Sequence, residues 1–280
     1  MFRRLSLALA TLLVTAGSAV AQPAAQQPLT FWYDYTVRPG KEADFLNLVK
    51  TIGQPVRDKL MADGVVMAWG LEVPVLRVPG QATHTIWYDV ADMAGVEKVQ
   101  NAMAEQLAKI AADEAAKKVP KGMTTADRSL EVFDASKTRD WLTRDVVRNI
   151  ATTLPPAGTL PYTGYASVKT RPGKGGDYRR AWEKYNKPVL DKLVADGTLL
   201  GYGLGVEVVK TTGDFTYFSW SVTKDLAARD KLRAAFLAVQ NSQSEETRRA
   251  VTGLFLETLD ADASRQSLAR SLIFKVGEQK

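Results

Sequence analysis

Tryptophan and aspartate residues recur in three strand-like segments of the first half of the chain. Side chains at every second position of a strand point to the same face of a sheet. By this alternation we assign five residues to one shared face: Asp34, Trp87, Asp89, Trp141 and Asp145. Tryptophan offers flat apolar contact, and a carboxylate can hold or deprotonate a polar substrate. The pattern favours a binding site for a small, partly aromatic molecule.

The second half has serine at all five matching positions when the two halves are aligned. These serines are Ser167, Ser219, Ser221, Ser267 and Ser271. An acidic and aromatic wall facing a hydroxyl wall would make an asymmetric cavity. The alternative is an interface that tolerates polar side chains because they pair across strands.

The expected ligand-binding residues are Trp32, Asp34, Trp87, Asp89, Trp141, Asp145, Ser167, Ser219 and Ser221. Among them, Asp34 is the candidate catalytic base, because an enclosed carboxylate can accept a proton from a polar substrate.

Several kinds of site are disfavoured by composition. The chain has no cysteine and a single histidine, His84, which argues against Ser-His-Asp or Cys-His nucleophiles and against ordinary zinc sites. His84 starts a strand-like segment on the opposite face from Trp87, a position typical of a surface or capping residue rather than a haem ligand. No acidic loop has the spacing of a calcium site. We therefore predict no metal and no cofactor.

The net charge gives no sign of nucleic-acid binding. The chain carries a formal charge of +6, and the excess of basic residues is spread along the sequence rather than clustered. Nucleic acid is therefore not an expected partner.

One long stretch occurs twice. Residues 38–70 and 171–203 both begin with Arg-Pro-Gly-Lys and share the motif Pro-Val-x-Asp-Lys-Leu-x-Ala-Asp-Gly at a constant offset of about 133 positions. A repeat of that length indicates a duplicated domain.

Each half is predicted to have the element order β-α-β-β-α-β, with a small helix before the last strand. In the first half the strands are expected at 29–37, 65–78, 83–90 and 141–150, and the main helices at 41–63 and 93–118. This is the ferredoxin-like order, in which two helices cover one face of a four-stranded sheet. The other face is bare in a single copy, so we expect the two sheets to pack against each other.

The topology and the duplicated motifs resemble the dimeric α/β-barrel superfamily, here fused in tandem. The resemblance covers nearly all of residues 29–276 and implies an α+β fold: two ferredoxin-like βαββαβ repeats packed sheet to sheet as a pseudo-dimeric α/β barrel. It also implies a cavity between the sheets. Members of the superfamily include cofactor-free quinol-type monooxygenases and haem-handling enzymes.

The expected domain boundaries follow from composition. Residues 1–21 have a basic start, an apolar stretch and an Ala-x-Ala end, typical of a cleaved signal peptide. The remaining predicted segments are a flexible leader (22–28), the first repeat (29–150), a proline-rich linker (151–161) and the second repeat (162–280). We expect a periplasmic or secreted protein with no lipid anchor and no later membrane span.

Three functions remain open from the sequence. The leading hypothesis is an exported protein that binds a small, partly aromatic molecule between its sheets. The first alternative is a cofactor-free monooxygenase or isomerase that acts on a phenolic or quinone-like substrate. The second alternative is a structural or partner-binding envelope protein with a filled barrel.

The duplication predicts a monomer, because the second copy already covers the sheet face that would otherwise drive dimerisation. Light scattering of residues 22–280 at micromolar concentration should give the mass of one chain. A stable dimer under these conditions would contradict the prediction.

Overall fold

The computed structural model describes residues 27–153, 155–156, 158–211 and 215–277. The predicted signal peptide, residues 1–21, lies outside these residues. The strands are β1 (Leu29–Tyr35), β2 (Val66–Pro74), β3 (His84–Val90), β4 (Arg139–Ile150), β5 (Tyr162–Thr170), β6 (Leu199–Glu207), β7 (Tyr217–Thr223) and β8 (Leu259–Val276). The helices of the first half are α1 (Glu42–Leu48), η1 (Val49–Gly53), α2 (Gln54–Ala62), α3 (Met93–Ala116), α4 (Thr125–Val132) and η2 (Ala135–Lys137). Those of the second half are α5 (Gly175–Tyr185), α6 (Lys187–Ala195), α7 (Leu226–Ser242) and α8 (Glu245–Thr258).

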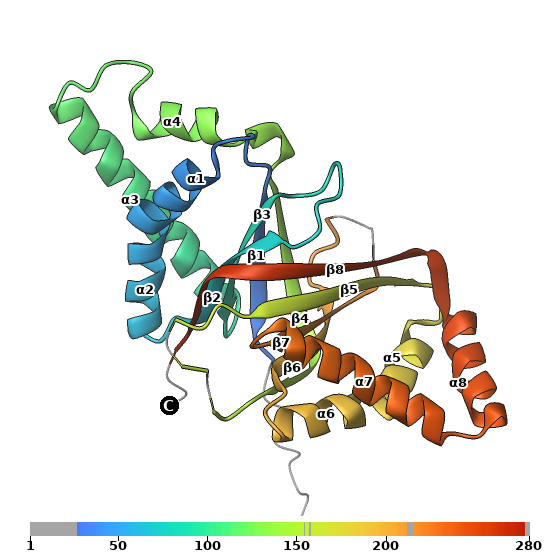
Figure 1. The fold of residues 1–280 in the computed structure, drawn as a ribbon. Helices are drawn as coiled ribbons and strands as arrows, with labels where there is room; N and C mark the ends of the chain where they lie inside the picture. Colours follow the sequence, from blue (N-terminus) through green and yellow to red (C-terminus); the bar gives the residue numbers. More distant parts are fainter. Residues whose placement is uncertain (1–26, 154, 157, 212–214, 278–280) are drawn as a thin grey trace, which may run out of the picture.

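The eight strands form one closed barrel in the order β1-β3-β2-β8-β5-β7-β6-β4, with the helices outside it (Figure 1). The predicted fold class, two ferredoxin-like repeats packed sheet to sheet, is therefore wrong. The two halves do not stack as separate sheets. They join edge to edge along two seams, where β2 pairs with β8 and β4 pairs with β6.

The unpaired edges of each half explain this arrangement. Within a half the strand order leaves two edge strands, β2 and β4 in the first half and β6 and β8 in the second. An open edge exposes a row of backbone N–H and C=O groups, and closing a barrel pairs all of them. β4 and β8 are the longest strands, with 12 and 18 residues, and each extends along the other half. The sequence pattern of alternating faces contains no information on which edges will meet.

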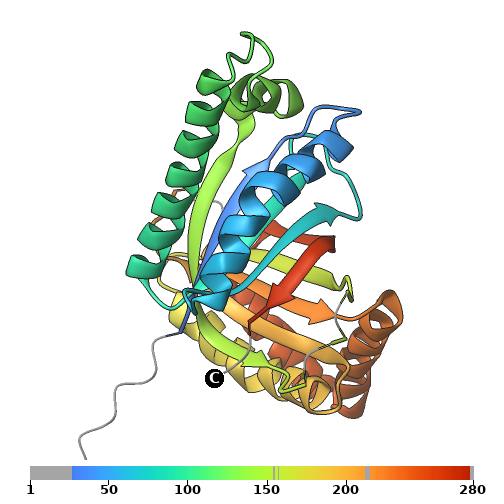
Figure 2. The same ribbon diagram turned by 90° about the vertical axis from the view of Figure 1, so that its left-hand side faces the viewer.

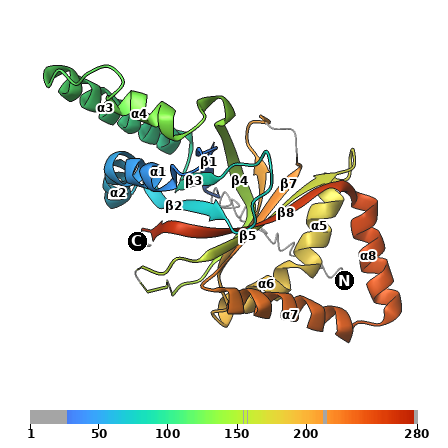
Figure 3. The ribbon, with the colours of Figure 1, turned by 45° about the horizontal axis from the view of Figure 1, so that its top comes forward.

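The helices of the two halves cover opposite sides of the barrel. Figure 3 shows α1–α4 on one side and α5–α8 on the other, and Figure 2 shows the same division from a second direction. Each helix layer packs on the outer face of the strands beneath it and forms a separate apolar core, to which the long strand of the other half contributes Ile273 of β8 or Val147 of β4. A third apolar cluster lies inside the barrel and contains Trp32, Ala68, Trp87, Trp141 and Phe218.

Proline positions divide the first long helix of each half. Pro55 lies in the first turn of α2, directly after the π-helical turn η1, and Pro188 lies in the first turn of α6. A proline has no N–H to donate, which is tolerated in a first helical turn but not in a helix interior. The long helix is accordingly interrupted just before each proline, by η1 in the first half and at Asn186 in the second. Among the described residues, no helix is long and apolar enough to cross a bilayer.

Glycines on β2 and β6 make room for two indole rings inside the barrel. Gly70 is paired with Trp87 across β2 and β3, and Gly203 with Trp220 across β6 and β7. A methyl group on Gly70 would lie 2.8 Å from the ring of Trp87, and one on Gly203 would lie 2.5 Å from the ring of Trp220. Gly70 and Gly203 therefore leave the space that the rings of Trp87 and Trp220 occupy.

The close approach of Trp220 makes Gly203 sensitive to substitution. Gly203→Ala should lower the free energy of unfolding by about 1–3 kcal/mol, because the ring must move within a packed interior. Denaturant unfolding followed by circular dichroism measures this change. Gly253 of α8 is a suitable control, since a Cβ there meets no atom within 4 Å. Gly253→Ala should stabilise the fold by about 0.5–1 kcal/mol. Equal effects of the two variants would contradict the prediction.

Candidate functional site

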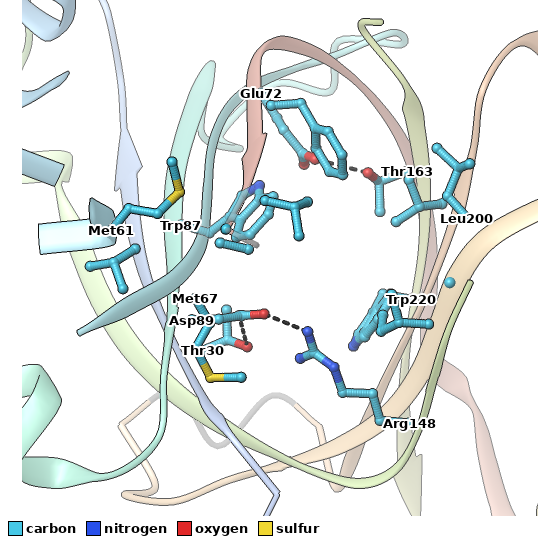
Figure 4. A pocket seen from close by; sticks show the side chains of 18 of the residues that line it. Thr30, Met61, Met67, Glu72, Trp87, Asp89, Arg148, Thr163, Leu200 and Trp220 are labelled. Carbon is cyan, nitrogen blue, oxygen red and sulfur yellow. Dashed lines mark hydrogen bonds and ion pairs between the residues drawn. The ribbon is translucent and has the colours of Figure 1, made fainter. Parts of the chain in front are cut away.

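A cavity of about 700 Å³ lies inside the barrel and draws side chains from both halves. Its aromatic lining consists of Trp32, Trp87, Tyr165, Trp220 and Phe274. Its polar lining includes Thr30, Glu72, Asp89, Arg148 and Thr163. Met61, Met67, Leu200 and Pro155 also contribute to the lining, and Met67 is 45% exposed. In Figure 4 Glu72 and Thr163 lie at one end, Asp89, Thr30 and Arg148 at the other, and Trp87 and Trp220 on opposite sides.

Trp87 and Trp220 occupy equivalent positions in the two halves, 133 residues apart. Each indole N–H is directed toward a buried carboxyl group. Trp220 Nε1 donates to Asp145 Oδ1 at 3.1 Å. Trp87 Nε1 lies beside Glu72 without completing a hydrogen bond (Figure 4). Both rings therefore form apolar walls of the cavity, and that of Trp220 is held in place by a carboxylate.

A buried ion-pair network forms one end of the cavity. Arg148 donates to Asp89 Oδ2 at 2.7 Å and to Asp145 Oδ2 at 3.3 Å, while Thr30 donates to Asp89 Oδ1 at 2.7 Å. The guanidinium lies over the ring of Trp220, 5.3 Å from its centroid. Burial raises the pKa of Asp145 to about 6, although Arg148 and Trp220 act in the opposite direction. Burial opposes the charge of Arg148, but its two carboxylate partners outweigh this effect and raise its pKa.

Glu72 forms the other end of the cavity and is only 2% exposed. Thr163 donates to Oε1 at 2.8 Å, and Tyr165 donates to Oε2 at 2.5 Å. Burial raises the pKa of Glu72, because the charged form loses hydration when the carboxyl group is buried. Burial and the neighbouring Glu72 also raise the pKa of Tyr165, so that its hydroxyl keeps its proton. Glu72 belongs to the first half and both donors to the second, so the barrel seam creates this site.

The structure places Asp34, the predicted base, away from the residues that line this cavity. Its carboxylate accepts hydrogen bonds from Thr85 Oγ1 at 2.7 Å, Arg139 at 3.0 Å and Trp141 Nε1 at 3.0 Å. Trp141 stacks on Trp32 with 4.8 Å between ring centroids. Asp34 and Trp141 therefore support the aromatic packing behind the cavity.

Of the other predicted residues, four line the cavity or contact its lining, one faces inward without lining it, and two face outward. Trp32, Trp87 and Asp89 line the cavity, and Asp145 contacts it through Arg148 and Trp220. Ser167 shares the inward face of β5 with Thr163 and Tyr165 but does not line the cavity.

Ser219 and Ser221 belong to the outer face of β7. Ser221 Oγ accepts a hydrogen bond of 2.6 Å from Arg229 of α7, which lies outside the barrel. The residues that face inward are Phe218, Trp220 and Val222. The assignment of β7 to the wrong face came from a one-residue shift in aligning β7 with β3, which moves every side chain to the other face. With the offset of 133 kept, Trp220 aligns with Trp87 and Val222 with Asp89.

His84 lies outside the barrel, where its ring packs 4.9 Å from that of Phe45. Burial lowers its pKa to about 4, so the imidazole is neutral at physiological pH. A haem bound in the cavity would find no histidine ligand, because this is the only histidine in the chain. Within the described ranges, no group of three or more His, Asp or Glu residues is arranged to hold a metal ion.

The sequence interpretation missed Glu72, Arg148 and Trp220. A correctly aligned third strand would have identified Trp220. Glu72 stands at a position where the second half has Gly205, a contrast that marks it as unusual on an inward face. Arg148 had no comparable signal, because two of its three partners, Asp89 and Trp220, come from other strands of the barrel.

Comparison with known proteins identifies the fold of this chain but not its function. No protein-family model matches the sequence, and no curated protein matches it. A provisionally assigned monooxygenase from Fusobacterium nucleatum subsp. nucleatum has a similar structure, with a TM-score of 0.58 and 12% sequence identity over 92% of this chain and 99% of that one. A second provisionally assigned monooxygenase, from Lactobacillus acidophilus, gives a TM-score of 0.56 and 7% identity over 90% and 97% of the two chains. The chain shares the overall fold of these two proteins.

The raised pKa of Glu72 should appear in the pH dependence of stability. The folded state holds the proton of Glu72 at pH values where the unfolded state has released it, so this residue destabilises the fold as pH rises above about 4.3. Among the described residues, Tyr165 is the one titratable side chain that forms a hydrogen bond with the carboxyl group, and it stays neutral in this range. The unfolding free energy of Glu72→Gln, relative to the unchanged protein, should therefore increase between pH 4 and pH 8.

Urea denaturation at both pH values measures this difference. Glu183→Gln, which changes a glutamate on the outside of α5, is the control and should show no such increase. A difference between Glu72→Gln and the unchanged protein that is independent of pH would contradict the raised pKa.

Proposed function

We propose that the protein binds a small, partly aromatic molecule in the barrel cavity. The observation that carries this proposal is the cavity of about 700 Å³ between the indoles of Trp87 and Trp220. Pockets for small organic ligands typically enclose about 300–1,000 Å³ and combine apolar walls with a few polar groups. The cavity has this composition, since its aromatic walls are combined with polar groups at the Glu72 end and at the Arg148 end.

The geometry favours a ligand with a planar apolar body. Aromatic rings bind other rings by offset stacking or edge-to-face contact. Trp32, Tyr165 and Phe274 extend the apolar surface around the two indoles. A filled barrel, the alternative expected for a purely structural protein, is difficult to reconcile with an interior volume of this size.

A second candidate is catalysis of the monooxygenase or isomerase type without a cofactor. The observation in its favour is Glu72, a buried carboxyl group in the cavity whose pKa is raised, as is common for acids and bases at active sites. Monooxygenase is also the activity provisionally assigned to the two structural neighbours. In this case Glu72 or Asp89, rather than Asp34, would exchange a proton with a phenolic or quinone-like substrate.

We place this function outside the cytoplasm as part of the proposal. Its support is the sequence pattern of residues 1–21, with Arg3 and Arg4 before an apolar stretch and Ala19-Val20-Ala21 at its end.

Binding can be tested with 1-naphthylmethanol, an uncharged aromatic probe, by isothermal titration calorimetry. Trp87→Phe and Trp220→Phe should each weaken binding about two- to tenfold, because an aromatic pair contributes about 0.5–1.5 kcal/mol. Trp182→Phe is the matched control, since Trp182 of α5 is also a buried tryptophan but packs against Tyr202 of β6, outside the barrel. The proposal fails if all three variants bind the probe as tightly as the unchanged protein does.

A further inference from the structure

Acidic groups outnumber basic ones around the cavity, although the chain as a whole is basic. Arg148 is the one basic residue among the described residues that line the cavity. Glu72 and Asp89 also line it, and Asp145 contacts Arg148 and Trp220 from behind. The whole chain has 37 Lys and Arg against 31 Asp and Glu. The interior therefore has the opposite charge balance from the rest of the molecule.

Arg148 is already shared between two carboxylates and lies far from the Glu72 end in Figure 4. No described cationic side chain forms an ion pair with Glu72, and its two hydrogen-bond partners are the neutral hydroxyls of Thr163 and Tyr165. A buried carboxylate normally has a positive partner or becomes neutral. The Glu72 end of the cavity therefore has an acidic group without a counter-ion.

Glu72 is nevertheless surrounded by hydrogen-bond donors suited to its ionised form. Besides Thr163 and Tyr165, the indole N–H of Trp87 and the hydroxyl of Ser271 lie beside it, and both atoms are buried without a partner. Ser271 is the residue directly opposite Glu72 on β8. An ionised carboxylate can accept about four hydrogen bonds. Four donors are thus available to a charged Glu72, and only the positive charge is missing.

Comparison of the two halves shows where that charge would lie. Arg148 is paired with Gly203, beside Trp220, and the equivalent residue paired with Gly70, beside Trp87, is Phe274. At the Trp220 end the arginine completes an arrangement of indole, carboxylate and cation. At the Trp87 end the indole and the carboxyl group are present, but a phenyl ring replaces the cation. A positive group can be held there by the face of an aromatic ring and by Glu72 together.

We propose that the Glu72 end of the cavity binds a cationic group of the ligand, so that the ligand is an aromatic or arylalkyl amine in its ammonium form. This inference rests on the proposed binding function and specifies its ligand class. The ammonium group lies against Glu72, with Trp87 and Phe274 beside it, while the aromatic body lies between the two indoles. Binding draws Glu72 into its ionised form, because the ligand supplies the counter-ion that the protein lacks.

Three naphthalene probes that differ only in charge test the proposal by isothermal titration calorimetry at pH 7.5. The probes are 1-naphthylmethylamine, which is cationic, 1-naphthylmethanol, which is neutral, and 1-naphthoate, which is anionic. The amine should bind about tenfold or more tightly than the alcohol, because a desolvated cation gains both ring and carboxylate contacts. The anion should bind least tightly, because it faces an excess of carboxylates.

Glu72→Gln should remove this preference by lowering the affinity for the amine about tenfold while leaving the affinity for the alcohol almost unchanged. Glu183→Gln, on the outside of α5, should leave the ratio of the two affinities as it is. Phe274→Lys is a second variant that does not depend on the stability of Glu72→Gln. It places a fixed ammonium group beside Glu72 and should also abolish the preference for the amine.

The outcomes separate the two proposals. If the alcohol binds but the amine binds no more tightly, or if both variants keep the preference for the amine, the inference is wrong and the proposed binding function stands. If none of the three probes binds, the proposed function fails and the inference fails with it. Preference for the amine that is lost in both variants supports the inference.

Discussion

The pairing of open sheet edges is the constraint on which the rest of this structure depends. Each half has a four-stranded sheet with two free edges, and buried backbone groups must find partners. The seams β2–β8 and β4–β6 provide those partners and turn two open sheets into one barrel. The interior exists because of this closure, since its walls come from strands that are far apart in the sequence. Glu72 and Thr163, for example, are separated by 91 positions.

Aromatic packing decides which part of the interior stays open. Trp141 stacks on Trp32, and Phe218 meets Trp141 at 5.1 Å in an edge-to-face arrangement. The indole N–H of Trp141 donates to Asp34, which holds this ring in place. The three packed rings fill this part of the barrel. Around Trp87 and Trp220 the glycines of β2 and β6 let the rings lie flat against the wall. The result is one packed region and one open region, which accounts for the position of the cavity.

Equivalent positions in the two halves form the frame of the cavity, and the positions at which the halves differ supply its chemistry. The positions of Trp87 and Trp220, Thr30 and Thr163, and Gly70 and Gly203 are equivalent in the two halves. Each of the two threonines donates to a carboxyl group, but the acceptors are Asp89 on β3 in one case and Glu72 on β2 in the other. Arg148 has Phe274 as its counterpart. A pseudo-symmetric cavity therefore has two ends with different charge, and such a cavity can orient an asymmetric ligand.

The sequence by itself determined the repeated motifs, the order of strands and helices and most of their boundaries. Helical periodicity, the breaks at Pro55 and Pro188 and the repeated motifs are local signals that do not depend on distant contacts. It also identified Trp32, Trp87 and Asp89 as inward-facing residues. Only the tertiary structure decided that the halves close into one barrel, because edge pairing is a property of the backbone and leaves no side-chain pattern. It also decided which side chains of β7 face the interior, because a shift of one residue in the alignment places Ser221 rather than Trp220 inside the barrel. The sequence contains Glu72 and its hydrogen-bond donors Thr163 and Tyr165, but only the closed barrel brings them together, because Glu72 lies on β2 and the donors lie on β5.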